Sequence, residues 1–544
     1  MISTRYPSSA HCTEDTTRVL NESLALLLIF SLIYSSPLQE ELIVHRQIQE
    51  IPDQFIHTGK ANPNTPLTFR IKLASHNLTG LEKRLYETSD PTNQQYGIHL
   101  TKEQVDDHVR PHPNVTTAFN RWMSQHGITP TAITKAGHEL TIQVSVAQAN
   151  KIFNASFLEY NDTSSDRTII RTTQYSVPRT VAEHVRYVYP TTQFSNPEIR
   201  QYRKKKTPAS TGVIFSNTTT RRDPCDPNQV SIGCLMNLYS VPNNIETPKS
   251  PGKVGILSLG GAIQGKAVAA FMKASRTDIP LSGLQLEIMS LQGGDNLQTP
   301  TFSPIDNGES NLDAEMVLGL TPSSPTVGIS DTAGDGFGSS FCILAEQDEP
   351  PEVLSVSYVG TEILWDRDQL MSICDCIMQL AVRGTTVVAG SGDDGVASGG
   401  RNCTLFNVGA TDLSSGTETG AFFSGGGFSF IYPTPQYQIG AVQSYLEQLG
   451  SLEAGHYNVT GRGVPDISAI GEGVWFFNNG TGGIIDGTSI STPVVAAIIS
   501  GLNLQRRANG KSSLGFVNPL IYAHPEVLND ITQGTTILEL HIYM

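Results

Sequence analysis

The sequence predicts an α/β protein in which a parallel sheet is covered by helices on both of its faces. Beyond Cys234, short apolar runs alternate with helical patterns, and this order is typical of repeated strand–helix–strand units. The runs are almost continuously apolar, as strands buried on both faces must be. The expected strands are 254–259, 284–291, 326–330, 353–358 and 385–389. The expected helices between them are 267–276, 312–320 and 370–382.

An α+β unit is expected to precede this sheet, because 544 residues are too many for one ordinary domain. Its strands are expected at 68–73 and 140–146, and its helices at 78–88 and 115–125. A polar stretch that includes Lys204–Lys206 then separates the two units. That basic run is either a site for a processing protease or a solvated charge cluster. We therefore divide the chain into 1–38, 39–195, 196–223 and 224–544.

The first segment, 1–38, contains an apolar block at 24–33 of the length found in secretory signal peptides. A bilayer-spanning helix needs about 20 apolar residues, so no stable membrane insertion is expected. A buried core helix is the alternative, and the acidic residues ahead of the block are unusual for a signal peptide. The density of Asn-x-Ser/Thr sequons supports a secreted, extracellular glycoprotein. They begin at Asn21, Asn77, Asn114, Asn154, Asn161, Asn217, Asn402, Asn458 and Asn479.

Charge and cysteine content exclude several classes of protein. A net charge of −15 and a pI near 5.3 argue against a nucleic-acid partner. Seven cysteines are too few for a disulfide scaffold at this length. Cys225 and Cys234 are spaced to close a small loop, whereas Cys374 and Cys376 share one expected helix and need partners elsewhere. The cysteine and histidine spacings do not suggest a zinc site.

A glycine-led turn at 486–493 places Ser489 at the start of a helix whose next residues, 494–499, are apolar. Backbone N–H groups at a helix N-terminus stabilise an anion that forms there, which suits a nucleophile. Gly487 allows close approach of a substrate, and we expect Pro493 to be tolerated as part of the first helical turn. The alternative is a simple helix cap.

Two further sets of acidic residues occur earlier in the chain. Glu309 and Asp313 are four residues apart on one expected helix, where two close carboxylates can share a proton. Asp393 follows a strand in a glycine-rich turn, which aims it at the carboxyl edge of the sheet. A solvated helix face and a capping aspartate are the respective alternatives.

The distribution of histidine excludes a familiar Ser-His-Asp arrangement. Ten of the thirteen histidines precede residue 200, and the α/β region holds only His456, His524 and His541. A subtilisin-type peptidase would need a usable histidine base, and none has a fitting context. The Glu309 and Asp313 pair is therefore the expected base for Ser489.

These motifs occur in the order found in the sedolisin family, the serine-carboxyl peptidases, and the chain resembles its secreted fungal tripeptidyl-peptidases most. The resemblance covers nearly everything from about 44 to 532. It rests on Glu309 with Asp313, on Ser391-Gly392-Asp393, and on Gly487-Thr488-Ser489 with Pro493. Supporting motifs are found at 90–97, 170–176, 234–239, 424–428, 461–466 and 528–532.

The resemblance implies a subtilisin-like fold, with a removable pro-domain at 39–195 similar to a pro-kumamolisin activation domain and a peptidase domain at 224–544. It implies Ser489 as nucleophile, Glu309 as general base, Asp313 as its partner and Asp393 as oxyanion donor. The expected product is a secreted, monomeric zymogen that hydrolyses peptides or proteins in acid and releases tripeptides from free N-termini. A sedolisin-type endopeptidase is an alternative.

The resemblance also implies one Ca²⁺ site, for which Asp530 and the carbonyl of Ile531 match half of the expected ligands. The glycine-rich loop that completes the set is missing before the chain ends, so the C-terminus is expected to be truncated. Calcium takes six to eight oxygen ligands. A catalytically impaired secreted paralogue, or a mis-spliced product, is therefore a further alternative.

Overall fold

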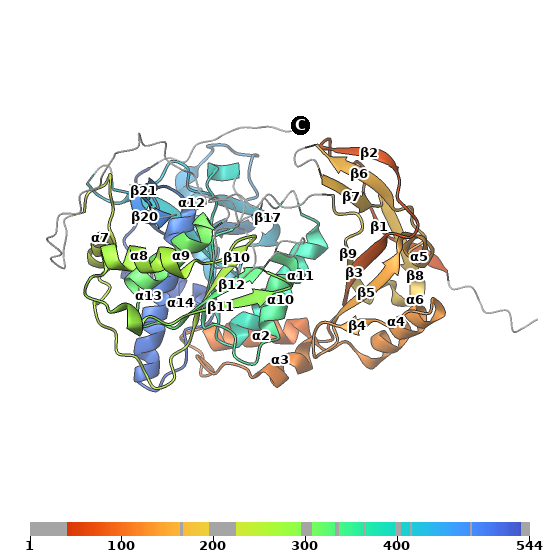
Figure 1. Ribbon diagram of the computed structural model, residues 1–544, viewed down its shortest axis with the longest axis horizontal. Helices are drawn as coiled ribbons and strands as arrows, with labels where there is room; N and C mark the ends of the chain where they lie inside the picture. Colours follow the sequence, from red (N-terminus) through yellow and green to blue (C-terminus); the bar gives the residue numbers. More distant parts are fainter. Residues whose placement is uncertain are drawn as a thin grey trace, which may run out of the picture.

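The protein is described by a computed structural model over residues 41–163, 167–194, 225–294, 307–331, 337–358, 360, 362, 365–397, 404–413, 416–478 and 481–534. The expected signal segment at 1–38 and the whole linker at 196–223 lie outside these residues. Figure 1 shows two bodies side by side, one red to yellow and one green to blue. Within the described part of the chain, no helix is both long and apolar enough to cross a bilayer.

The C-terminal body is built on an eight-stranded sheet, which confirms the predicted α/β class. Its neighbours run β11-β12-β10-β13-β14-β15-β16, and β19 also pairs with β15. All pairs are parallel except β15 with β16. The strands are β10 (Val254–Leu259), β11 (Leu286–Leu291), β12 (Thr326–Asp331), β13 (Val353–Val356), β14 (Thr386–Gly390), β15 (Phe406–Asp412), β16 (Thr419–Gly420) and β19 (Ile467–Ile470).

Helices cover both faces of this sheet, because its strands are apolar on both sides. One face packs against α7 (Ile232–Leu238), α8 (Gly265–Ser275), α9 (Gly308–Leu320) and α13 (Thr488–Ala508). The other face packs against α10 (Phe337–Ala345) and α11 (Arg367–Val382). The remaining elements are β17 (Gly427–Pro433), β18 (Gly461–Val464), β20 (Val474–Asn478), β21 (Thr481–Ile485), α12 (Ile439–Leu449), α14 (Asn518–Ala523) and the 3₁₀ turns η1 (Leu281–Gly283), η3 (Gly395–Ala397), η4 (Gln436–Gln438) and η5 (Pro525–Val527).

Helix α9 is buried along its whole length, so Glu309 and Asp313 do not lie on a solvated helix face. It lies between α8, α13 and β20 and also contacts β10 and β12, so no side of it faces water. Three carboxylates, Glu309, Asp313 and Glu315, are therefore placed in the core. Buried carboxylates are costly unless they are protonated or hydrogen-bonded, which is why they point to a function.

The N-terminal body is the expected α+β unit. A four-stranded antiparallel sheet in the order β4-β5-β3-β9 packs against helices, and β2-β6-β7 and β1-β8 form two smaller sheets. The strands are β1 (Leu42–Gln47), β2 (Phe55–Lys60), β3 (Pro66–Leu73), β4 (Thr131–Ala132), β5 (Glu139–Ser145), β6 (Leu158–Asp162), β7 (Arg167–Arg171), β8 (Gln174–Pro178) and β9 (Val185–Tyr189). The helices are α2 (Leu78–Ser89), α3 (Lys102–Val109), α4 (Pro113–Gln125), α5 (Val146–Ile152) and α6 (Arg179–Ala182).

The two bodies meet on α11. Apolar residues of α2 and α3 pack against apolar residues of α11 in one buried cluster. Beside them, the buried Lys72 of β3 reaches α11, where its Nζ donates to the Ser372 carbonyl at 3.1 Å and to the Ser372 hydroxyl at 2.7 Å. The same Nζ lies 3.1 Å from an Asp375 carboxylate oxygen. A buried lysine with three such partners fixes how β3 sits on the helix.

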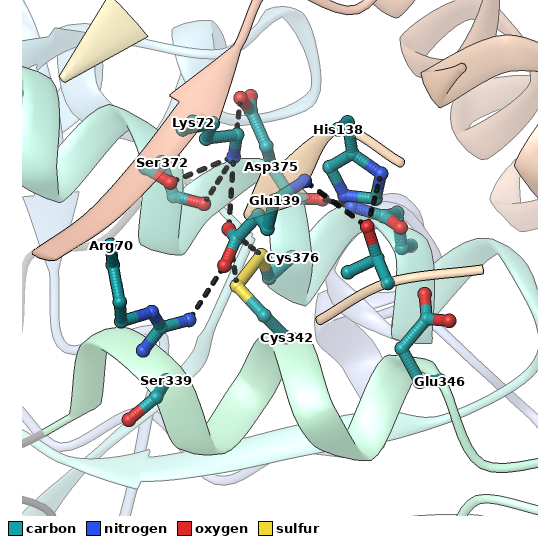
Figure 2. The surroundings of a disulfide bond; sticks show 12 residues. Arg70, Lys72, His138, Glu139, Ser339, Cys342, Glu346, Ser372, Asp375 and Cys376 are labelled. Atoms are coloured by element: carbon teal, nitrogen blue, oxygen red, sulfur yellow. Dashed lines mark hydrogen bonds and ion pairs between the residues drawn. A yellow bond between two sulfur atoms is a disulfide. The ribbon is translucent and has the colours of Figure 1, made fainter. Parts of the chain in front are cut away.

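A disulfide lies directly beneath this contact (Figure 2). Cys342 of α10 is bonded to Cys376 of α11, which confirms that Cys376 has a partner outside its own helix. The Glu139 carboxylate of β5 covers the bond, with Oε1 3.1 Å from Cys342 Sγ, and Arg70 holds the other oxygen at 2.6 Å. The expected small loop is also closed, by a bond between Cys225 and Cys234.

Candidate active site

The candidate site lies at the carboxyl ends of two neighbouring parallel strands. Strands β13 and β14 pair in register, so the residues that follow them emerge at the same edge of the sheet. Ser357 follows β13, and the turn with Asp393 follows β14. The N-terminus of α13 reaches this edge as well, because α13 packs across β13, β14 and β15. The sheet therefore brings together segments that are far apart in the sequence.

Ser489 is the second residue of α13 and is 4 % exposed. Its hydroxyl donates to the carbonyl oxygen of Ser357 at 3.3 Å. Gly487 caps the helix with a φ of +155°, and a Cβ there would lie 3.1 Å from Asp393 Oδ2. A side chain at Gly487 would therefore press on Asp393, which explains the glycine at this turn.

Pro493 is not in the first turn of α13, so the expectation based on the sequence is wrong. It is the sixth helical residue, and a residue there would normally donate to the carbonyl of Ser489 four positions earlier. Because proline has no N–H, the helix supplies no such bond. The Ser357 hydroxyl lies 3.4 Å from that same carbonyl oxygen. Pro493 thus leaves the backbone of the candidate nucleophile open to a partner from β13.

Asp313 is buried on α9, one turn after Glu309. The Ser357 hydroxyl donates to its two carboxylate oxygens, at 2.8 and 3.0 Å. Burial, and then the negative charge of Glu309, raise the pKa of Asp313 well above its usual range, while the Ser357 bond opposes that rise. Burial and the same two carboxylates also raise the pKa of the Tyr358 hydroxyl. The pair therefore retains a proton more readily than two exposed carboxylates would.

Asp393 is fixed by the residue that precedes the candidate nucleophile. Its Oδ1 accepts from the Thr488 backbone N–H and from the Thr488 hydroxyl, both at 2.8 Å. The Thr488 hydroxyl also accepts from the N–H of Gly392 at 3.2 Å. These bonds lock the turn after β14 to the start of α13. The other oxygen, Oδ2, lies on the Gly487 side.

The structure thus links three of the four predicted residues through hydrogen bonds. Asp313 joins Ser489 through Ser357, and Asp393 joins it through Thr488. Glu309 is placed beside Asp313 by the helix and by its electrostatic effect. A serine, two coupled carboxyls and a third carboxyl near the helix N-terminus can carry out acyl transfer with acid–base help.

Sequence reasoning missed Ser357 and Thr488. Thr488 lies within the Gly487-Thr488-Ser489 motif, but the sequence did not show that its side chain would bond Asp393. Ser357 ends the run Val353–Tyr358, and a polar residue at the carboxyl end of a buried strand was an available signal.

The predicted calcium ligands lie near the end of the described residues. Asp530 is exposed and Ile531 is partly exposed. In the described ranges, the only cluster of three His, Cys, Asp or Glu ligand atoms is Glu139 with Cys342 and Cys376, whose sulfurs are bonded to each other. Calcium also takes backbone carbonyls as ligands, which such a cluster does not count, so calcium binding by Asp530 and Ile531 stays a prediction.

Residues 53–194 match the family described as "Pro-kumamolisin, activation domain". The chain is similar to "Probable tripeptidyl-peptidase SED3" of Trichophyton verrucosum (strain HKI 0517), with 30% identity over 529 residues that cover 90% of this chain and 87% of the relative. It is 29% identical to "Tripeptidyl-peptidase SED2" of Arthroderma otae (strain ATCC MYA-4605 / CBS 113480), over 88% of this chain and 86% of that one.

Among solved structures, Pseudomonas sedolisin (serine-carboxyl proteinase), complexed with two molecules of pseudo-iodotyrostatin, is similar at 20% identity with a TM-score of 0.43. The match covers 57% of this chain and 89% of sedolisin. The relatives cover the activation domain and the peptidase unit together, at an identity and length that define a family. The chain therefore belongs to the sedolisin family and is a serine-type peptidase that carries an activation domain.

Proposed function

We propose that the chain is an acid-acting serine-carboxyl peptidase in which Ser489 is the nucleophile, Glu309 its general base, Asp313 the partner of that base and Asp393 the oxyanion donor. The observation that supports this most is the continuous contact from buried Asp313, through Ser357, to Ser489. A carboxyl pair held in the core beside a serine at a helix N-terminus has little structural purpose, because burying carboxylates is costly.

In the first half of the reaction, the Ser489 oxygen attacks the carbonyl carbon of the scissile peptide bond and its proton passes to Glu309. The carbonyl oxygen becomes an oxyanion, which accepts a hydrogen bond from the protonated Asp393 carboxyl. The tetrahedral intermediate then breaks its C–N bond, and Glu309 gives the proton to the leaving amine. The acyl group is left as an ester on Ser489.

In the second half, a water molecule attacks the ester carbonyl and loses its proton to Glu309. The C–O bond to Ser489 then breaks, and Glu309 returns the proton to the serine oxygen. Asp393 can donate only while it is protonated, and the coupled pair works with one shared proton. Both requirements favour acid and disfavour neutral pH.

We also propose that the peptidase is secreted and releases tripeptides from free N-termini. The relatives are named tripeptidyl-peptidases, and the signal-like block at 24–33 and the sequons support secretion. The N-terminal body, docked on α11, would hold the zymogen inactive until acid loosens it and the linker at 196–223 is cut. We expect the mature enzyme to act as a monomer on peptides or unfolded proteins.

The first prediction is that Ser489→Ala abolishes both peptide cleavage and self-maturation, because no other group can form the ester. Full-length protein, treated with acid, would be assayed with an unblocked tripeptide–fluorophore substrate at about pH 4 and about pH 7. An N-terminally blocked longer peptide would be assayed in parallel. Retained acid activity in the Ser489→Ala protein would remove Ser489 from its role.

The same assay separates the alternatives. Release from the unblocked substrate alone supports a tripeptidyl-peptidase, whereas cleavage of the blocked peptide supports an endopeptidase. Folded protein without activity on either substrate would identify an impaired paralogue. Running each assay with calcium and with a chelator tests the ion, since a loss of folded protein in the chelator would show that calcium stabilises the fold.

A further inference from the structure

Ser357 contacts both parts of the proposed machinery. Its hydroxyl donates to the two carboxylate oxygens of Asp313 at 2.8 and 3.0 Å, and its carbonyl accepts from the Ser489 hydroxyl at 3.3 Å. Ser357 is 4 % exposed, so water cannot readily replace these bonds.

The fold holds Ser357 from two sides. It follows β13, a central strand whose neighbours β10 and β14 are both parallel to it. On the other side, Pro493 leaves the Ser489 carbonyl without its helical donor, and the Ser357 hydroxyl lies 3.4 Å from that oxygen. The hydroxyl therefore lies between a carboxylate and a backbone carbonyl, with its position set by strand and helix.

We propose that Ser357 is a positioning residue that couples the protonation of Asp313 to the placement of Ser489. This rests on the proposed function, since it assigns Ser357 a part in the reaction of the same site. As a donor to Asp313, the hydroxyl favours the ionised form of that carboxyl. An ionised Asp313 in turn strengthens Glu309 as a base. The carbonyl of the same residue holds the Ser489 hydroxyl before it turns toward its base.

The groups that face Asp313 come from three elements. Glu309 lies on α9 itself and raises its proton affinity, while Ser357 and Tyr358 follow β13. From α13, the start of the helix carries Ser489 and no charged side chain in its first turn. Asp393, which Thr488 holds, faces that helix start from β14. Among these groups in the described part of the chain, Ser357 donates the hydrogen bond to the Asp313 carboxylate.

Removing the hydroxyl should shift the pH dependence and not only reduce the rate. Without this donor, the ionised form of Asp313 is less favoured relative to the protonated form. The Glu309 and Asp313 pair therefore keeps its shared proton to a higher pH. The enzyme needs an ionised base, so the acidic limb of the kcat/KM profile should move upward. A hydrogen bond to a charged group is strong enough to shift that limb by about one pH unit.

The test compares Ser357→Ala, Ser357→Thr and Ser355→Ala in the acid-matured enzyme. Ser355 is a matched control, because it is a buried serine of β13 two residues earlier whose hydroxyl has no hydrogen-bond partner among the described residues. We expect Ser357→Ala to shift the acidic limb upward by about one unit with little change in KM, since Ser357 is not assigned to substrate binding. Ser357→Thr keeps a hydroxyl and should restore the wild-type limb, and Ser355→Ala should leave it unchanged.

An acidic limb that is the same in Ser357→Ala and Ser355→Ala would overturn the proposal, even if both variants were slower. Wild-type protein without peptidase activity would instead reject the proposed function, so the two failures are distinguishable. If Ser357→Ala does not fold, Ser357→Cys serves in its place, because a thiol is a weak donor. An upward shift in that variant supports the proposal, and an unshifted limb contradicts it.

Discussion

At the scale of single residues, Asp393 shows how neighbouring donors define what a carboxyl can do. Its Oδ1 accepts two hydrogen bonds, from the N–H and the hydroxyl of Thr488. Because Oδ1 is already engaged as an acceptor, we expect the proton that Asp393 donates to an oxyanion to sit on Oδ2, on the side of Gly487. The same two bonds fix the carboxyl plane, so the donor is already oriented before the substrate arrives.

We expect Asp393→Ala to lower kcat about 10²–10³-fold, the usual loss for one oxyanion donor. Asp393→Asn should lose less, because its amide oxygen can accept both Thr488 bonds while its NH₂ donates in place of the carboxyl. An amide donates at every pH, so the remaining activity should extend further toward neutral. Stopped assays of kcat from about pH 3 to about pH 7 would check both variants.

Thr488→Ser is the matched control, since it keeps the hydroxyl that bonds Asp393 and Gly392. Equal losses in Asp393→Ala and Asp393→Asn, with both proteins folded, would show that donation is not the task of Asp393.

The sequence placed the candidate site residues on the helices and turns where the structure has them, but it did not predict what surrounds each side chain. The i, i+4 spacing of Glu309 and Asp313 placed both on one helix, because helix geometry is local. Their burial depends on α8, α13 and β20, which follow from tertiary packing. Ser357 was missed because its bonds to Asp313 and Ser489 join segments 44 and 132 residues away. The error over Pro493 came from a helix start that lies earlier than a cap rule suggested.

At the scale of elements, α9 carries a third buried carboxyl that the proposed reaction does not use. Glu315 Oε2 accepts from the N–H of Phe477 in β20 at 2.9 Å, while Oε1 has no hydrogen-bond partner among the residues that the structure describes. Burial raises the pKa of Glu315 well above its usual range, and the Phe477 bond only partly opposes this. Strand β20 leads through β21 into the turn before α13, so this bond also supports the site.

The sign of the pH effect follows from that raised pKa. The folded protein binds the Glu315 proton more tightly than the unfolded chain does. The contribution of Glu315 to stability is therefore complete below about pH 4.5, the ordinary pKa of a glutamate in the unfolded chain. This contribution is lost as the pH rises through the pKa that Glu315 has in the folded protein. The buried carboxyl thus makes the peptidase unit more stable in acid than at neutral pH.

We expect Glu315→Gln to raise the melting temperature at about pH 7 and to leave it nearly unchanged at about pH 4. Glutamine keeps an acceptor for Phe477 and has no charge to bury. Thermal melts of the inactive Ser489→Ala protein at both pH values would measure this without self-digestion. Glu447→Gln, at an exposed position on α12, is the control and should change neither melt. If Glu315→Gln instead lowered the melting temperature at both pH values, the packing of the side chain, and not its charge, would determine the stability effect at this position.

The order of strands and helices was predicted well for the first half of the peptidase unit. Strands β10 to β14 and helices α8, α9 and α11 lie within a few residues of the predicted positions, because their apolar runs are long and periodic. Strands β15 to β21 were not predicted as elements. Several are short or glycine-rich, and their pairing joins distant segments, so local pattern carries little signal.

At the scale of the whole molecule, most histidines lie in the N-terminal body, which contains the activation domain. Ten of the thirteen histidines precede residue 200, and six of those that the structure describes are buried or partly buried: His45, His99, His108, His126, His138 and His184. Burial lowers the pKa of His45 and of His99 below the ordinary value, and lowers the pKa of His138 to about 3. His99 Nε2 contacts the Ser513 carbonyl of the peptidase unit at 2.9 Å, so it lies in the interface itself.

The sign of this effect is opposite to that of Glu315. A histidine whose folded pKa is lowered takes up a proton more readily once it is exposed. Its contribution to docking is therefore complete above about 6.5 and is lost as the pH falls toward the lowered value. Arg506 and Arg507 reinforce the effect at His99, because their positive charges oppose a second one. We therefore expect acid to weaken the docking contribution of His99 and to retain the stabilising contribution of Glu315.

We expect His99→Gln to lower the pH at which the activation domain separates from α11, because glutamine does not titrate. Hydrogen exchange of α11 in the Ser489→Ala zymogen, followed over a pH series, would report separation without any need for catalysis. His57→Gln, at an exposed position on β2, is the control. A separation pH unchanged by His99→Gln would assign acid release to other groups, such as the carboxylates that hold Lys72.

The disulfide between Cys342 and Cys376 has a consequence for the lifetime of the enzyme. In the zymogen both sulfurs are buried, and the carboxylate of Glu139, itself part of the departing body, lies against them. An incoming thiolate thus cannot reach the buried sulfurs, and the negative charge of Glu139 repels it. When the activation domain is removed, we expect the side of the Cys342–Cys376 disulfide that Glu139 covers to become exposed to solvent. Activation would therefore also expose the Cys342–Cys376 disulfide to reducing agents. In a thiol-rich environment, we expect reduction of this bond to limit how long the mature enzyme stays active.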